Sequence, residues 1–142
     1  MSQNLYDNEK FFNLYKELRC KINSANNLEE KPELLLLLPN LKGKRVLDLG
    51  CGYGEWCKIY SEMGASYVKG IDISSKMLDV AKSECSKFSN IKFDLMDMAN
   101  LSELDETFDV VMSSLAVHYV EDFEKLCKDV KKILNKDGIF LF

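Results

Sequence analysis

The sequence predicts an α/β protein in which helices cover both faces of a parallel sheet. From residue 44 onward, short runs rich in Val, Ile and Leu alternate with longer stretches whose apolar residues recur at helical spacing. Near-continuous apolar runs such as RVLDL and DVVM are typical of buried parallel strands. Right-handed crossovers between such strands give a doubly wound sheet, with a ligand crevice at the carboxyl ends of the strands.

Strands are expected where β-branched and aromatic residues cluster between polar or glycine-containing segments. The expected strands are 45–49, 67–71, 91–94, 108–113 and 139–142. A helix follows the first strand, with one apolar face made by Trp56, Ile59, Tyr60 and Met63. Trp56 is interpreted as a core residue of that face.

The later helices are predicted in the same way. The second one presents Met77, Leu78, Ala81 and Cys85, with Ser74 or Ser75 as its N-cap. Only a short helix, near 100–104, fits between the third and fourth strands. The last helix presents Phe123, Leu126, Cys127, Val130 and Leu134 and ends at a turn over 135–138.

Apolar spacing also predicts helices before residue 44, one through Phe11, Tyr15, Leu18 and Ile22 and a second over 28–38. The chain is accordingly divided into an N-terminal helical segment, 1–43, and a core, 44–142. That segment is expected to form a cap over the cofactor or substrate.

Composition narrows the class of protein. A chain of 142 residues, 46% hydrophobic and 30% charged, fits one soluble domain. The net charge of -4 disfavours nucleic acid as a partner. The longest apolar run, 34–38, is far below the ~20 residues that span a bilayer, and the first residues lack a secretory pattern, so a cytoplasmic protein is expected.

Cysteine and histidine content excludes further classes of site. Five cysteines, without a CxxC pair, indicate neither a disulfide framework nor a zinc cluster. A metal site with several histidines is excluded because His118 is the only histidine, and no metal is expected.

Three glycines, Gly50, Gly52 and Gly54, directly follow the first expected strand. A strand, a glycine-rich turn and a helix together let a ligand contact bare backbone and a helix N-terminus, which favours a nucleotide-type cofactor. A plain tight turn is the alternative, although one glycine usually suffices for that. In a dinucleotide fingerprint the third glycine would fall at Glu55, whose carboxylate would repel a pyrophosphate.

With Asp48, these glycines form a D-x-G-x-G-x-G pattern, which resembles motif I of the class I S-adenosylmethionine-dependent methyltransferases. Three later segments also resemble that family: GIDIS and LMDM at the ends of strands two and three, and FDVVMSSLAVHY, which is similar to motif IV. LNKDGIFLF resembles the helix-turn-strand that follows. The resemblance covers residues 44–142 and implies a Rossmann-like sheet of strand order 3-2-1-4-5 with S-adenosylmethionine as cofactor.

The resemblance also implies roles for acidic residues. Asp72 would hold both ribose hydroxyls, and the alternative is a carboxylate that only caps the next helix. Asp97 would contact the adenine, or else cap a loop. Asp48 and Cys51 belong to the loop motif, and for Asp48 the alternative is a structural acid that ties down the loop amides.

Apolar and motif IV residues complete the implied cofactor site. Ile73 and Met98 would sandwich the adenine, although core packing explains either equally well. The backbone of Ser114 would approach the methionyl end, unless it only starts a helix.

Methyl transfer is an in-line displacement, so an enzyme must align the nucleophile and remove its proton if it has one. His118 is the candidate base because its unperturbed pKa suits proton transfer, and Tyr119 is a second candidate. A lone histidine with a structural role is the alternative. Tyr6, Tyr15 and Arg19 could close over the cofactor, but ordinary helix positions are the preferred interpretation for them.

The family's nucleic-acid enzymes carry a [DNS]-PP-[YFW] motif or a Pro-Cys nucleophile, and this chain has neither after strand four. A small-molecule acceptor is therefore expected. The alternatives are a module that binds the cofactor without turnover, and a nicotinamide-dependent oxidoreductase, against which Glu55 argues. Family members continue past strand five, so the chain is expected to lack the last two strands, either through truncation or with a partner covering the strand-five edge.

Overall fold

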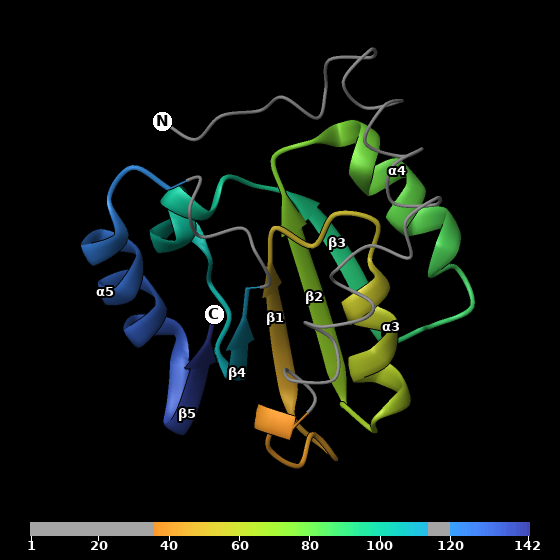
Figure 1. Ribbon diagram of the computed structural model, residues 1–142, viewed down its shortest axis with the longest axis horizontal. Helices are drawn as coiled ribbons and strands as arrows, with labels where there is room; N and C mark the ends of the chain where they lie inside the picture. Colours follow the sequence, from red (N-terminus) through yellow and green to blue (C-terminus); the bar gives the residue numbers. More distant parts are fainter. Residues whose placement is uncertain (1–35, 114–119) are drawn as a thin grey trace.

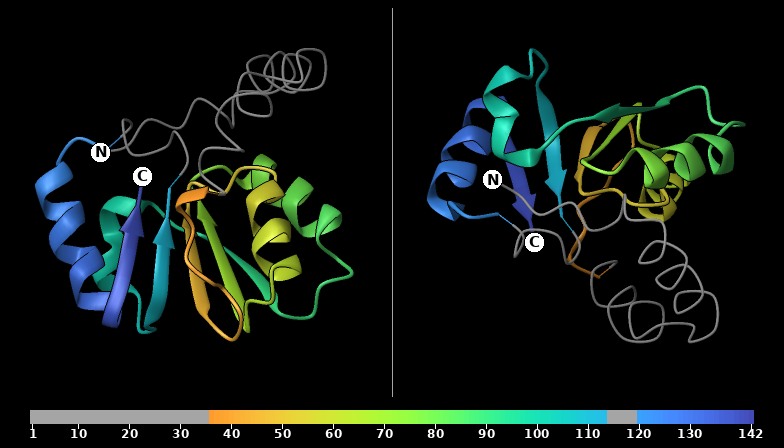
Figure 2. Two further views of the ribbon diagram at one scale, coloured as in Figure 1. Left: turned by 60° about the horizontal axis from the view of Figure 1, so that its bottom comes forward. Right: turned by 90° about the horizontal axis from the view of Figure 1, so that it is seen from above.

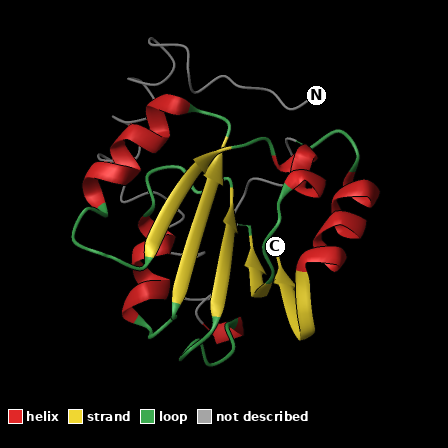
Figure 3. Cartoon of the chain, turned by 180° about the vertical axis from the view of Figure 1, so that it is seen from behind, coloured by secondary structure: helices red, strands yellow, loops and turns green. Residues whose placement is uncertain are grey.

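The computed structural model describes residues 36–113 and 120–142 of the chain (Figure 1). Their strands form one sheet of order β3-β2-β1-β4-β5, in which every neighbouring pair is parallel. The strands are β1 (Arg45–Leu49), β2 (Tyr67–Asp72), β3 (Ile91–Leu95), β4 (Phe108–Met112) and β5 (Leu134–Leu141). The predicted strand order is confirmed, and the bounds of β1 to β4 agree with the predicted ranges to within one residue. Figure 3 shows the arrows side by side, with their carboxyl ends at one edge.

Helices cover both faces of this sheet (Figure 2). On one face lie α3 (Glu55–Glu62) and α4 (Ser75–Glu84), and on the other lie the 3-10 helix η3 (Met98–Glu103) and α5 (Phe123–Ile133). Alternate residues of β1 serve the two cores: Val46 packs with the α3 side and Leu47 with the α5 side. Because of this alternation, charged side chains of neighbouring strands can contact one another only when they point to the same face of the sheet.

Two predictions about the helices on the α3 side of the sheet are confirmed. Ser74 is the N-cap of α4, because its hydroxyl accepts a hydrogen bond from the Met77 amide at 3.2 Å. Trp56 is partly buried and stacks on Tyr60 with ring centroids 5.9 Å apart, which confirms its interpretation as a packing residue.

Strand five begins earlier than predicted. Helix α5 ends at Ile133 and β5 starts at Leu134, so the assignment of Leu134 to the helix was wrong. The predicted turn, 135–138, lies inside β5 as an irregularity: Phe108 pairs with Leu134, but Val110 pairs with Ile139. A positive φ of 64° at Asp137 lets the backbone make this excursion without leaving the sheet.

Two further differences concern helices. Phe123, predicted on the apolar face of α5, is 40% exposed, while Asp129 is buried and pairs with Lys125 at 2.8 Å. The connection before β4 holds a 3-10 helix that starts at Met98, two residues before the expected range. The predicted N-terminal helices lie almost wholly outside the described residues, and within those residues no helix has the length and apolarity to span a bilayer.

Candidate functional site

The glycine loop, residues 50–54, joins β1 to α3 at the carboxyl edge of the sheet. Gly50, Gly52 and Gly54 have positive φ angles of 69°, 54° and 81°, a region that favours glycine. The amides of Gly50 and Cys51 both donate to the Ile71 carbonyl, at 2.8 and 2.9 Å. These bonds fix the loop against the end of β2, so the backbone conformation is built into the fold.

Gly52 and Gly54 serve different purposes within that loop. A Cβ at Gly54 would lie 3.0 Å from Phe93 Cζ and 3.1 Å from Cys85 Sγ, so close packing requires glycine there. A Cβ at Gly52 would meet no described atom within 4 Å. The loop is therefore closely packed against the protein at Gly54. At Gly52 its backbone is uncovered and has open space beside it, as contact with a cofactor requires.

Asp72 connects the loop to the next helix. It lies at the end of β2 and is only 8% exposed. One carboxylate oxygen accepts from the Gly52 amide at 2.9 Å and the other from the Ser74 amide at 2.9 Å. The helix-capping arrangement of the alternative interpretation is thus present, and a carboxylate, with about four acceptor positions, can accept other hydrogen bonds besides these two. Ribose binding by Asp72 stays a prediction.

Asp48 lies beneath the loop, on the α3 face of the sheet. It is 2% exposed, and its hydrogen bond is to the Cys57 thiol, whose sulfur lies 3.6 Å from Oδ2. Burial raises the pKa of Asp48 to about 7; the Cys57 thiol opposes this rise and the nearby Asp72 adds to it. The amides of Gly50 and Cys51 donate to Ile71, that of Gly52 to Asp72 and that of Gly54 to the Cys51 carbonyl, so the interpretation of Asp48 as their anchor was wrong.

The residues predicted around the adenine are held by their own local structure. Asp97 is the N-cap of η3, accepting from the Ala99 amide at 2.9 Å. Met98 is 9% exposed and packs in the α5-side core, while Ile73 is half-buried. Loop capping by Asp97 and core packing by Met98 are thus present, and adenine contact by these residues stays a prediction.

The predicted residues after β4 lie outside the described residues: Ser114, His118 and Tyr119. The same holds for Tyr6, Tyr15 and Arg19. The last residue described before the gap is Ser113, whose hydroxyl donates to the Leu49 carbonyl at 3.3 Å. This bond ties the end of β4 to the end of β1, beside the glycine loop.

Three residues that support the loop were missed by the sequence reasoning. Cys57 holds the Asp48 carboxyl, and Phe93 packs against the loop glycine, Gly54. Gly70 is the third, because a Cβ there would lie 2.8 Å from both Cys51 Sγ and Phe93 Cδ1. A glycine inside a buried strand signals a close approach of this kind and could have identified Gly70; no local signal pointed to Cys57.

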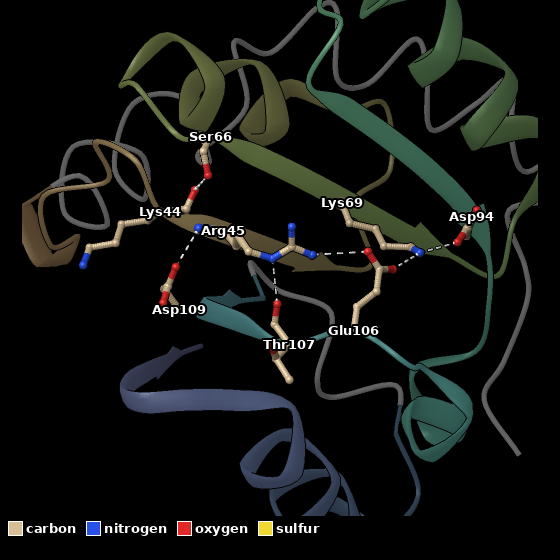
Figure 4. Close-up of polar contacts among 8 residues, drawn as sticks. All are labelled: Lys44, Arg45, Ser66, Lys69, Asp94, Glu106, Thr107 and Asp109. Atoms are coloured by element: carbon tan, nitrogen blue, oxygen red, sulfur yellow. Dashed lines mark hydrogen bonds and ion pairs between the residues drawn. The ribbon is translucent and has the colours of Figure 1, made fainter.

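A second polar cluster, the cation network, consists of Arg45, Lys69, Asp94 and Glu106 (Figure 4). Lys69 is buried in β2, and its ammonium pairs with Asp94 at 2.6 Å and also with Glu106. Arg45 pairs with Glu106 at 3.4 Å and lies over the Tyr67 ring at 4.5 Å. Burial raises the pKa of Glu106, but the hydrogen bond and charge of Lys69 outweigh it and hold the pKa below its usual value. The alternation of side chains places this network on the sheet face opposite Asp48.

Known proteins are similar to this chain in both sequence and fold. A family model of the methyltransferase domain matches residues 47–142. A protein of uncharacterised function from Haemophilus influenzae is 44% identical over 144 residues, covering 97% of this chain and 56% of that protein. The ubiquinone biosynthesis O-methyltransferase of Neisseria meningitidis serogroup C is 30% identical over 106 residues, covering 72% of this chain and 44% of that enzyme. The chain spans about half the length of these curated relatives.

Solved structures agree with the sequence relatives. An S-adenosylmethionine-dependent methyltransferase from Mesorhizobium loti superimposes with a TM-score of 0.72 at 38% identity, covering 82% of this chain and 51% of that one. Together with the family match over most of the chain and the 3-2-1-4-5 sheet, this confirms the family that the glycine loop predicts. The chain belongs to the methyltransferase-domain family, whose cofactor is S-adenosylmethionine.

Proposed function

We propose that this protein is a methyltransferase that transfers a methyl group from S-adenosylmethionine to a small-molecule acceptor. The observation that carries this proposal is the join between the glycine loop and β2, where the Asp72 carboxylate accepts from the Gly52 amide at 2.9 Å. Bare backbone and a carboxylate then lie side by side at the carboxyl edge of the sheet, where doubly wound folds bind ligands. Membership of the family argues against the nicotinamide-dependent alternative.

The residues of this edge have distinct tasks in the proposal. Asp72 accepts hydrogen bonds from the ribose hydroxyls, and Gly52 lets the cofactor lie close to the backbone. Asp97 and Met98 contribute to the adenine side, with Ile73. When bound, S-adenosylmethionine supplies an electrophilic methyl group, and the protein's part is to hold the acceptor in line with it. His118 is proposed to remove the acceptor's proton, with Tyr119 as the second candidate.

The acceptor class rests on relatives. The Neisseria meningitidis relative is named for ubiquinone biosynthesis, and a Staphylococcus epidermidis relative, 26% identical over 148 residues, is a demethylmenaquinone methyltransferase. Both names indicate small quinone-type molecules, which supports a small-molecule acceptor here. We also propose a cytoplasmic location. A further proposal is that a partner segment covers β5, where Ile139 is 38% exposed.

A matched pair of glycine variants tests the cofactor site. Gly52 and Gly43 both have positive φ, 54° and 74°, and a Cβ at either meets no described atom within 4 Å. Alanine therefore imposes a similar backbone strain, about 1 kcal/mol, at both positions. Gly52→Ala is expected to weaken S-adenosylmethionine binding at least about 10-fold in calorimetry, because its methyl group stands over the loop. Gly43→Ala, in the turn before β1, is expected to bind normally; an equal loss in both variants would contradict this placement of the cofactor.

Turnover requires a separate test. Screening quinols and other small nucleophiles for release of S-adenosylhomocysteine identifies the acceptor, and His118→Ala is expected to reduce release about 100-fold or more without changing cofactor affinity. Tight binding with no release from any acceptor, by this chain or by a longer form of the protein, would favour the binding-module alternative.

A further inference from the structure

Asp48 is a buried carboxyl whose surroundings hold no compensating positive charge among the described residues. From α3 it is faced by the Cys57 thiol, and Cys51 of the loop hydrogen-bonds to that same thiol. From the end of β2 it feels the charge of Asp72, while its β4 neighbour, Met112, is apolar. The nearest basic residue of α3 in sequence, Lys58, pairs instead with Glu84 of α4 at 3.2 Å.

This arrangement makes the ionised form of Asp48 unfavourable. A carboxylate that is 2% exposed, beside another carboxylate and with one weak thiol donor, has little solvent around it and no counter-charge from the described residues. The pKa of about 7, caused mainly by burial, agrees with the geometry. A positive charge that arrives near such a group lowers its pKa by about one to three units.

We propose that Asp48 carries a proton in the ligand-free protein and releases it when the cationic cofactor binds, so that Asp48 makes the site favour S-adenosylmethionine over S-adenosylhomocysteine. This inference rests on the proposed function. The two ligands share the ribose, the adenine and the methionyl end with its ammonium and carboxylate, and they differ in the methyl group and the sulfonium charge that the first carries. Loss of that charge on methyl transfer returns Asp48 to its protonated form, with the proton taken from solvent.

The sign of the pH dependence follows from linkage. Because Asp48 ionises more readily in the complex with the cation, binding releases a proton, and affinity rises with pH until the ligand-free protein is itself ionised. For a ligand-free pKa near 7 and a shift of one to two units, affinity for S-adenosylmethionine rises about 5- to 20-fold between about pH 5.5 and 7.5. S-adenosylhomocysteine has the same methionyl ammonium but lacks the sulfonium, so its affinity changes less with pH through Asp48 than the affinity for S-adenosylmethionine does.

Calorimetry on the whole chain tests this directly. Titrations of both ligands near pH 6.5, in buffers of low and high ionisation enthalpy, give the number of protons released. We expect roughly half a proton or more for S-adenosylmethionine beyond the value for S-adenosylhomocysteine. In Asp48→Asn this excess is expected to disappear, and the ratio of the two affinities no longer changes with pH. An equal proton count for the two ligands, or an unchanged pH dependence in Asp48→Asn, would overturn the proposal.

A second variant keeps the test valid if Asp48→Asn does not fold. Cys57→Ala removes the thiol that donates to Asp48, which raises the pKa of Asp48 further, so the pH at which cofactor affinity rises moves upward. Cys127→Ala, at a half-buried position on α5, is the matched control and leaves that pH unchanged. An unmoved midpoint in Cys57→Ala counts against the proposal. If wild-type protein binds neither ligand at any pH, the proposed function itself fails.

Discussion

The sheet carries acidic residues on both faces, and the two groups have different partners. On the α5 side, Asp94 and Glu106 share the buried ammonium of Lys69. On the α3 side, the hydrogen-bond donor to Asp48 is a thiol, and at the loop Asp72 accepts from backbone amides. The first group carries its own counter-charge within the protein. In the second group, Asp48 is faced by no cation among the described residues, so a cationic ligand would improve its electrostatics, which is the difference expected between a structural network and a binding site.

The largest expected effect concerns Asp48, to which the described part of the chain supplies no counter-charge. The folded-state pKa of Asp48, about 7, lies above its ordinary value, so the folded state holds a proton that the unfolded state loses between about pH 4 and 7. Stability from this group is present below pH 4 and is lost as the pH rises through 7. Asp48→Asn is therefore expected to raise the free energy of unfolding by about 2 to 4 kcal/mol at pH 8, and by much less near pH 4.

Urea unfolding of Asp48→Asn at the two pH values measures this gain. Asp79→Asn, at an exposed position on α4, is the control and is expected to change stability by less than about 0.5 kcal/mol. A gain that does not depend on pH would show that Asp48 is not a buried titrating group.

The next effect concerns Asp72 and Asp94, two carboxylates near the carboxyl ends of the neighbouring strands β2 and β3. Asp72→Asn keeps the shape of the side chain but removes the charge, so cofactor affinity is expected to fall about 10- to 100-fold, the value of one charge-assisted hydrogen bond. Asp94→Asn is the matched control, because Asp94 is committed to Lys69. Equal losses in the two variants would remove the distinction between the two faces. Both affinities are measured by calorimetry with S-adenosylmethionine.

A smaller effect is expected from breaking the cation network. Lys69→Met keeps the apolar stem but leaves Asp94 and Glu106 without their shared ammonium. The free energy of unfolding is expected to fall by about 1 to 3 kcal/mol, less than for a fully buried pair because both carboxylates are partly exposed. Lys92→Met is the control: Lys92 stands opposite Lys69 in the β2–β3 register, but it is exposed.

The pH signature of that network is opposite to that of Asp48. Because the pKa of Glu106 is below its usual value in the folded protein, its stabilising contribution is present above the usual pKa and is lost as the pH falls. The cost of Lys69→Met in urea unfolding is thus expected to shrink toward pH 3. A cost that stays constant in acid would mean that packing of the lysine stem, rather than its charge, stabilises the sheet.

Local patterns in the sequence were sufficient to predict four of the strands, the start of α4 and the position of the glycine loop. Apolar runs placed β1 to β4, Ser74 marked the start of α4, and the three glycines marked the loop. The start of β5 could not be predicted, because Asp137 and Gly138 read as an ordinary turn and only pairing with β4 keeps them in the sheet. The partners of buried charges were also hidden, since Asp48 and Cys57, or Lys69 and Glu106, meet only through sheet register and helix placement.

One measurement addresses the central claim, that the cofactor binds beside the glycine loop and not at the cation network on the opposite face of the sheet. Amide ¹H–¹⁵N spectra of the whole chain, recorded while S-adenosylmethionine is added, report each region separately. The largest changes are expected at Gly52, Asp72 and Ser74, because the amides of Gly52 and Ser74 donate to the Asp72 carboxylate. The amides of Lys69 and Glu106 are expected to change little. Changes centred on Lys69 and Glu106, or no changes at saturating cofactor, would contradict the claim.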